Sequence, residues 1–273
     1  MNYQVYTPSQ ELQSFVKCFW TLEDERKKEQ AIQRVIPDGC MEMIFHYGDL
    51  YQQFFEDGTS VIQPRSFIFG QITNYIEIAP TGISGIVAAR FLPDGLTPFL
   101  TLPVADLENK AVSIADVFGE KGKALEEHVL SVTDNYARIK WIEEFLLSIL
   151  ADQRTIDTVA RNCVEVIFQS QGQMDVTVLS DKMNIHRRNM ERKFTSAIGL
   201  SPKQLSRVIR LQATLKMLQQ KKFTSLTSLA YENGYYDQAH FIKDFKEFTG
   251  MSPKSFFADN LKLSALFIAA DRE

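Results

Sequence analysis

The stretch LAYENGYYDQAHFIKDFKEFTGMSPKSF, residues 229–256, is a second copy of an earlier stretch in the same chain. The earlier copy is LSDKMNIHRRNMERKFTSAIGLSPKQL, residues 179–205. Matching residues are 50 positions apart before an inserted residue and 51 apart after it, as for Phe194 and Phe245. An internal repeat of this quality indicates that one supersecondary unit is present twice.

Each copy has the pattern of a helix-turn-helix unit. A short helix is followed by a turn at Asn184 in the first copy and at Asn233-Gly234 in the second. Asn and Gly tolerate the positive φ that a sharp change of direction often needs. A second apolar helix then ends at Gly199 or Gly250, and the Ser-Pro pair that follows predicts the next helix start.

A long helix is expected between the two copies, from residue 203 to about 220. Its apolar stripe consists of Leu205, Val208, Ile209, Leu215 and Leu218. Such a helix would hold the two units at a fixed separation.

Residues 165–258 resemble the DNA-binding domain of the AraC/XylS transcription regulators, in which a long helix joins two helix-turn-helix units. The resemblance is carried by LSDKMNI, MERKF, IGLSP, RVIRLQAT, LAYENGYYDQAHFIKDFKEFTGMSP and Phe256. His186 departs from the family, which usually has Ser or Thr there, and Tyr235 replaces a usual Phe. The resemblance implies a bacterial regulator whose partner is double-stranded DNA.

The resemblance also implies which side chains face DNA. The second helix of each unit reads base edges in the major groove with its N-terminal turns. The residues expected to contact bases are Arg187, Arg188, Glu191, Arg192, Gln238, Ala239, His240 and Lys243. Those expected to contact phosphates are Lys193, Arg207, Lys246 and Lys254. The alternative for HRRNMERK is a solvated helix face, and Arg210 is expected to be structural.

Residues 1–119 have the pattern of a β-rich domain. MEMIFHYG, residues 41–48, alternates like a strand, and SFIFGQI, NYIEIAP and ISGIVAARFLP are short runs of strand-forming residues. PSQELQSFVKCFW could carry a short helix before them. The stretches 35–49 and 89–119 resemble the sensor-like domain that precedes some AraC-type units, which implies a small cupin-like β-barrel.

The expected fold class is therefore α+β with two domains. The first is a cupin-like β-barrel with helices, and the second is an all-α domain of two helix-turn-helix units joined by a long helix. The expected boundaries are 1–119 for the sensor domain, 120–160 for a helical linker or dimerisation region, and 161–262 for the DNA-binding domain.

The β-rich half offers a candidate effector pocket or structural ion-pair cluster at Asp38, Glu42 and Arg90. A buried Arg90 needs an anionic partner, which either carboxylate or a ligand could supply. Glu42 and His46 share one strand face, but the further ligands that a catalytic metal needs are lacking. Cys40 has no basic neighbour to activate it as a redox switch. We predict no catalytic residues, no metal and no cofactor.

Charge divides the chain. Residues 1–160 carry 13 Lys and Arg against 23 Asp and Glu, whereas residues 161–262 carry 16 against 9. The basic half could bind a polyanion. Three scattered cysteines and the lack of a signal or membrane-spanning segment lead us to expect a cytoplasmic protein with no membrane partner.

We therefore expect a regulator that is not an enzyme, controlled through an effector or a homodimer. The alternatives are a cupin-like metal-dependent enzyme with an accessory helical domain, and a protein-interaction module that does not bind DNA.

Overall fold

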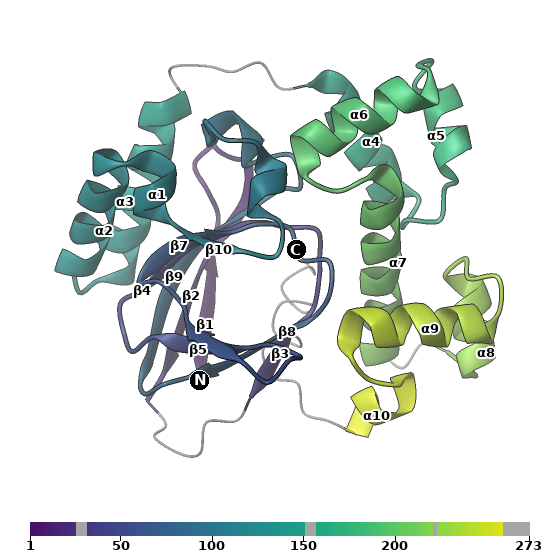
Figure 1. The fold of residues 1–273 in the computed structure, drawn as a ribbon, viewed down its shortest axis with the longest axis horizontal. Helices are drawn as coiled ribbons and strands as arrows, with labels where there is room; N and C mark the ends of the chain where they lie inside the picture. Colours follow the sequence, from purple (N-terminus) through teal and green to yellow (C-terminus); the bar gives the residue numbers. More distant parts are fainter. Residues whose placement is uncertain (26–31, 151–156, 221–222, 259–273) are drawn as a thin grey trace.

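The computed structural model describes residues 1–25, 32–150, 157–220 and 223–258. A β-rich N-terminal part and an all-helical C-terminal part lie side by side (Figure 1). None of the helices in the described ranges is both long and apolar enough to cross a membrane.

The strands pair antiparallel in two sheets. They are β1 (Asn2–Tyr6), β2 (Val16–Asp24), β3 (Gln33–Val35), β4 (Glu42–His46), β5 (Tyr51–Phe54), β6 (Ser60–Ile62), β7 (Ser66–Phe69), β8 (Ile76–Pro80), β9 (Ser84–Phe91) and β10 (Ala111–Ser113). One sheet has the order β1-β2-β9-β4-β7-β10, and the other has the order β3-β8-β5-β6. The expected cupin-like barrel takes the form of these two sheets, which share an apolar core (Figure 1).

Strand β4 shows how the alternation of the sequence divides the two cores, as predicted. Met43 and Phe45 are fully buried in a cluster with the helices that cover the larger sheet. Glu42, Ile44 and His46 point the other way and line a pocket between the sheets. Successive side chains of a strand point to opposite faces, so five residues supply both layers.

The predicted short helix before the strands is wrong. Residues 10–15 form a turn, in which the backbone N–H groups of Leu12 and Val16 donate to Ser9 and Leu12, and β2 begins at Val16. The Gln13 N–H also donates to Ser9, but no regular helix follows, because β2 begins at Val16.

Short helices cover the outer face of the larger sheet. They are η1 (Thr97–Phe99), η2 (Val104–Leu107), α1 (Ile114–Phe118), α2 (Glu120–Ser131) and α3 (Asn135–Leu150). Leu125, Ile142 and Leu146 pack into the same cluster as Met43 of β4. The helical region expected over 120–160 is thus observed to residue 150, and residues 151–156 lie outside the described ranges.

Seven helices form the C-terminal part within the described ranges: α4 (Thr158–Gln169), α5 (Val176–Lys182), α6 (Arg187–Ile198), α7 (Pro202–Gln219), α8 (Leu226–Glu232), α9 (Gln238–Thr249) and α10 (Pro253–Ala258). Helices α5 and α6 form the first helix-turn-helix unit, and α8 and α9 form the second. The predicted linker helix is α7, capped by Ser201 with Pro202 in its first turn.

The turn residues adopt the backbone conformations that their types suggested. Asn184 has a φ of 49° and Gly234 a φ of 71°. Gly199 and Gly250 end α6 and α9 in the left-handed conformation. Each unit therefore bends and stops where the repeat predicted.

The two parts of the chain touch along the C-terminal ends of α6 and α9. Thr97 Oγ1 donates to the carbonyl oxygen of Ala197 near the end of α6. Arg34 Nη1 donates to the carbonyl oxygen of Thr249, the last residue of α9, at 3.3 Å. The N-terminal turns of both helices consequently point away from the sheets (Figure 1).

Candidate nucleic-acid interface and enclosed pocket

The start of each recognition helix is fixed locally. Asp237 caps α9 by accepting a hydrogen bond from the backbone N–H of His240 at 2.7 Å. His186 occupies the same place before α6, but its side chain makes no capping hydrogen bond. The departure from Ser or Thr therefore leaves the first recognition helix without a side-chain cap.

In the first unit the predicted base readers differ in how free they are. Arg188 is exposed and makes no hydrogen bond or ion pair with any described residue. Arg187 Nε and Glu191 Oε1 are paired at 2.9 Å, one helical turn apart. Arg192 is exposed, bonds to Asn189 and lines a cleft that opens toward the N-terminal part. Arg188 is thus the side chain of this unit most available to a base edge.

In the second unit the predicted readers form an exposed corner at the start of α9. Ala239, His240 and Lys243 are exposed, and Gln238 is half-buried. Gln238 Oε1 accepts a hydrogen bond from Thr227 Oγ1 of α8 at 2.9 Å, which orients the amide. An oriented amide beside an exposed methyl group can read an adenine next to a thymine.

Lys193 and Arg207, which we expected at phosphates, are engaged inside the protein. Lys193 Nζ lies 2.9 Å from Asp157 Oδ2, the carboxylate that caps α4. Arg207 Nη2 lies 2.9 Å from Asp244 Oδ1 and 2.8 Å from Glu247 Oε2. Lys193 is the repeat equivalent of Asp244, so the inward face of each recognition helix carries one end of an ion pair. Lys193 and Arg207 are therefore not part of the DNA interface that we propose.

The other two residues expected to contact phosphates have accessible side chains. Lys246 and Lys254 are exposed, and neither is paired with a described residue. Arg210, expected to be structural, donates from Nη2 to the carbonyl oxygen of Gly172 at 2.9 Å and lies over the ring of Tyr235. It therefore ties α7 to the loop before the first unit.

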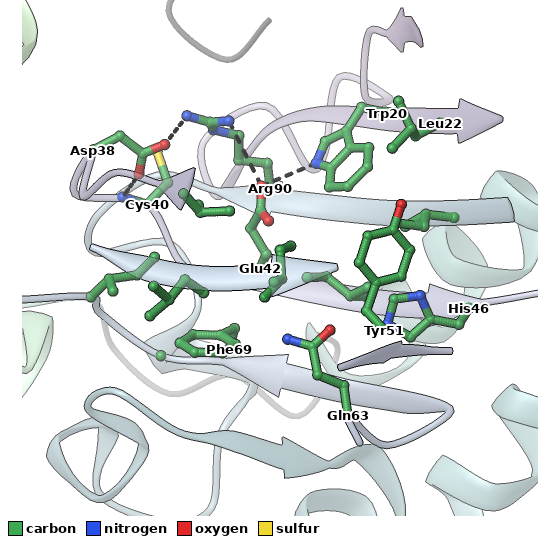
Figure 2. Close-up of a pocket in the computed structure, with 17 residues that line it drawn as sticks. Trp20, Leu22, Asp38, Cys40, Glu42, His46, Tyr51, Gln63, Phe69 and Arg90 are labelled. Atoms are coloured by element: carbon green, nitrogen blue, oxygen red, sulfur yellow. Dashed lines mark hydrogen bonds and ion pairs between the residues drawn. The ribbon is translucent and has the colours of Figure 1, made fainter. Parts of the chain in front are cut away.

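A second candidate site is the pocket between the two sheets, shown in Figure 2. Its walls are mainly apolar, with Ile44 of β4, Ile78 of β8 and Ile86 of β9 among them. The space that the centre of a water-sized sphere can occupy is about 70 Å³. A water needs roughly 10–15 Å³ by this measure, so the cavity has room for a small molecule.

Asp38, Glu42 and Arg90, the candidate cluster of the sequence, meet at one end of this pocket (Figure 2). Arg90 is almost fully buried and forms an ion pair with Asp38 through Nη2. Its Nη1 lies 3.7 Å from Glu42 Oε1, and Trp20 Nε1 donates to the same oxygen at 3.0 Å. Burial raises the pKa of Glu42 to about 7, although the Arg90 guanidinium opposes the rise.

His46 lies at the far end of the same strand face. Its side chain is 1% exposed and stacks on Tyr51, and Gln63 is the polar side chain that approaches its ring. Burial lowers the pKa of His46 to about 4, so the imidazole is neutral near pH 7.

The pocket does not have the arrangement of a metal centre. Glu42 and His46 are four residues apart on β4, about 13 Å at the rise of a strand, which is too far to share one ion. The described ranges contain no cluster of three or more His, Cys, Asp or Glu side chains suited to a metal. Burial also raises the pKa of Cys40 to about 12, which suppresses its thiolate.

The sequence did not reveal several functional neighbours. Trp20 and Gln63 line the pocket from strands or loops that no motif marked. Thr227 orients Gln238, which lies eleven residues further along the chain. Only the placement of Thr227 one residue after the start of α8 could have suggested it.

Two family models match the chain. Residues 4–113 match the family described as "Domain of unknown function (DUF6597)". Residues 179–259 match the family described as "Helix-turn-helix domain", which covers both units and α7.

Two curated bacterial relatives are similar over part of their length. One is an uncharacterized HTH-type transcriptional regulator of Haemophilus influenzae, 31% identical over 42% of this chain and 37% of that protein. The other is the Msm operon regulatory protein of Streptococcus mutans, 29% identical over 42% of each. The chain thus spans less than half the length of the curated relatives that it matches.

Solved structures of low identity also align. ToxT from Vibrio cholerae O395 is 11% identical, with a TM-score of 0.46 over 88% of this chain and 97% of that one. The C-terminal domain of AraT from Geobacillus stearothermophilus is 21% identical, with a TM-score of 0.35 over 38% and 86%.

The matched C-terminal family, the repeated units and the linker helix agree with the resemblance drawn from the sequence. The chain therefore carries a segment that matches the DUF6597 family, followed by a segment that matches the helix-turn-helix family across both units and the linker helix.

Proposed function

We propose that this protein is a sequence-specific regulator of transcription that binds double-stranded DNA with α6 and α9. Its N-terminal domain responds to a small molecule held in the pocket between the sheets. As a regulator of bacterial type it acts in the cytoplasm, where the DNA lies.

The observation that carries the proposal is the common orientation of the two recognition helices. Both turn their C-terminal ends to the N-terminal part and their N-terminal turns outward (Figure 1). Helix α7 has 18 residues, about 27 Å at the rise of an α-helix, and sets the separation of the units. Successive major-groove segments on one face of DNA are about 34 Å apart, so the two helices can enter neighbouring segments.

Two further observations favour DNA binding over the two alternative functions. An enzyme of the cupin type would need a ligand cluster that β4 does not offer, because Glu42 and His46 stand too far apart. A stoichiometric metal in the purified protein would favour that alternative. A protein-interaction module has no use for exposed cations at equivalent positions of the two recognition helices, which Arg192 and Lys243 occupy.

Binding of the full chain to duplex DNA at increasing salt concentrations tests the proposal. The logarithm of the affinity should fall linearly with the logarithm of the salt concentration, because bound phosphates release counterions. A binding affinity that does not change with salt would contradict the proposal and favour an interaction module.

A homodimer formed through the region 120–160 remains part of the proposal. Helix α3 exposes Tyr136, and Trp141 stacks on His128 of α2 with a centroid distance of 4.2 Å. Sedimentation of the full chain with and without duplex DNA would establish whether one copy or two bind.

A further inference from the structure

The charges that line the pocket are unequal. Two carboxylates, Asp38 and Glu42, face one guanidinium, Arg90, and His46 at the far end is neutral. Lys17 also acts on Glu42 but does not line the pocket among its described residues. When Glu42 is ionised, the pocket therefore holds one more anionic group than cationic group, and burial opposes this ionisation by raising the pKa of Glu42 to about 7.

Arg90 is not available to an anionic guest. It is buried and already paired with Asp38, and Glu42 lies within 4 Å on its other side. A ligand carboxylate could gain this cation only by displacing Asp38 and would then lie beside Glu42. Like charges in a buried site repel strongly, so an anion is disfavoured.

Glu42 is the group that a cationic guest would satisfy. Trp20 and Arg90 both approach its Oε1 atom, and neither of these contacts uses Oε2. The carboxyl group lies beside Arg90 and Trp20 at the charged end of the pocket (Figure 2). An ammonium N–H donated to Oε2 would supply the missing positive charge, and hydrogen bonds between charged groups are among the strongest.

The remaining lining of the pocket indicates what kind of ligand body it can hold. Leu22, Ile44, Ile76 and Ile86 line the same pocket as Glu42 and His46. These walls favour a compact apolar group. His46 and Gln63 also line the pocket and can offer polar atoms to a water or to a polar tip of the guest.

We infer that the pocket binds a small organic cation, a primary or secondary amine on a compact apolar body, with its ammonium group at Glu42. The inference rests on the proposed sensing role of the N-terminal domain, and it names the class of molecule that is sensed.

Calorimetric titration of the full chain, without DNA, tests this class directly. The probes are benzylamine, cyclohexylamine and isoamylamine, each compared with the alcohol of the same shape and with benzoate. At least one amine should bind roughly tenfold or more tightly than its alcohol, which is the gain expected from a charged hydrogen bond. If no amine exceeds its alcohol, or if benzoate binds best, the inference is overturned.

Two variants locate the site. Glu42→Gln should bring the affinity for the amine down to that for the alcohol without changing the affinity for the alcohol. Glu127→Gln, an exposed carboxyl on α2, should leave both unchanged. Should Glu42→Gln fail to fold, the comparison of amine and alcohol on the unmodified chain still decides. An amine preference that survives in Glu42→Gln would contradict the assignment.

The outcome is separable from the proposed function. Loss of amine binding with intact salt-dependent DNA binding rejects the ligand class alone. Amine binding without DNA binding rejects the regulator and leaves the pocket assignment standing.

Discussion

Gln212 of α7 donates a hydrogen bond from Nε2 to the carbonyl oxygen of Pro37 at 2.6 Å. Pro37 belongs to the turn that carries Asp38, so one short segment contacts both the pocket and the linker helix. Ile36, just before it, packs in the apolar cluster of α7, α8 and α9. A change at the charge cluster of the pocket therefore has a direct structural route to the DNA-binding units.

Gly39 tests whether the turn that carries Asp38 packs tightly on α7. It has a φ of 81°, and a Cβ atom there would stand 2.8 Å from Leu205 Cδ1 of α7. Gly39→Ala should destabilise the full chain by about 1 kcal/mol more than Gly58→Ala in urea unfolding. Gly58 has a nearly equal φ of 82° with no atom within 4 Å, so it reports the backbone strain alone. Equal losses in the two variants would mean that the turn does not pack tightly on α7.

The ion pair that joins α7 to α9 gives a second prediction. Asp244 is buried and bonds Arg207 through both of its oxygens, whereas Glu247 bonds the same arginine from an exposed position. Asp244→Asn should lower the free energy of unfolding by about 1–3 kcal/mol. Glu247→Gln should cost less than about 1 kcal/mol. Chemical denaturation of the two variants makes the comparison, and a larger loss in Glu247→Gln would reverse the assignment.

Glu42 and His46 should give the chain opposing pH dependences. The pKa of Glu42 is raised from 4.5 to about 7, so the folded chain keeps a proton that the unfolded chain loses. The stability that it contributes is present below pH 4.5 and is lost as the pH rises to 7. The pKa of His46 is lowered from 6.5 to about 4, so its contribution is lost as the pH falls from 6.5 to 4.

Removal of the Glu42 carboxyl should reveal the pH dependence of stability that His46 contributes. Glu42→Gln should gain stability with rising pH between 4.5 and 6.5 more steeply than the unmodified chain. Each shift corresponds to an effect on the order of 3 kcal/mol across its full range. Thermal unfolding between pH 4.5 and 6.5 measures the difference, with the exposed Glu127→Gln as control. Identical slopes in Glu42→Gln and the unmodified chain would show that Glu42 titrates as an ordinary carboxyl.

Two lysines on the recognition helices, Lys246 and Lys193, should respond differently to removal, because only Lys246 is free to contact DNA. Lys246→Ala should weaken binding by the same factor on every duplex and reduce the salt slope by about one. Lys193→Ala should leave the salt slope unchanged, because Lys193 is paired with Asp157. Affinities measured across a salt series decide this, and a reduced slope in Lys193→Ala would return that lysine to the interface.

The sequence predicted those features that depend on local chemistry. Asn184 and Gly234 adopt positive φ because their residue types allow it, and β4 alternates because strand geometry has a period of two. The cost of a buried cation predicted an anionic partner for Arg90 and left Asp38, Glu42 and a ligand open, and the ion pair forms with Asp38.

The sequence could not predict features that depend on residues far apart in the chain. Lys193 and Arg207 find Asp157 and Asp244 at separations of 36 and 37 residues, which no local pattern encodes. The strand order β1-β2-β9-β4 likewise joins segments that periodicity cannot pair. The turn over residues 10–15 was mistaken for a helix because helical spacing alone does not show that β2 follows at once.

The most direct measurement of the central claim is selection of binding sites from random duplexes by the full chain and by Arg188→Ala. The unmodified chain should select two short segments about one helical turn apart. Arg188→Ala should lose preference at one or two positions in one segment, at a cost of about 1–3 kcal/mol on the selected site, and keep the other segment. A uniform loss on all sequences, or no selected sequence at all, would contradict the claim that α6 and α9 read DNA.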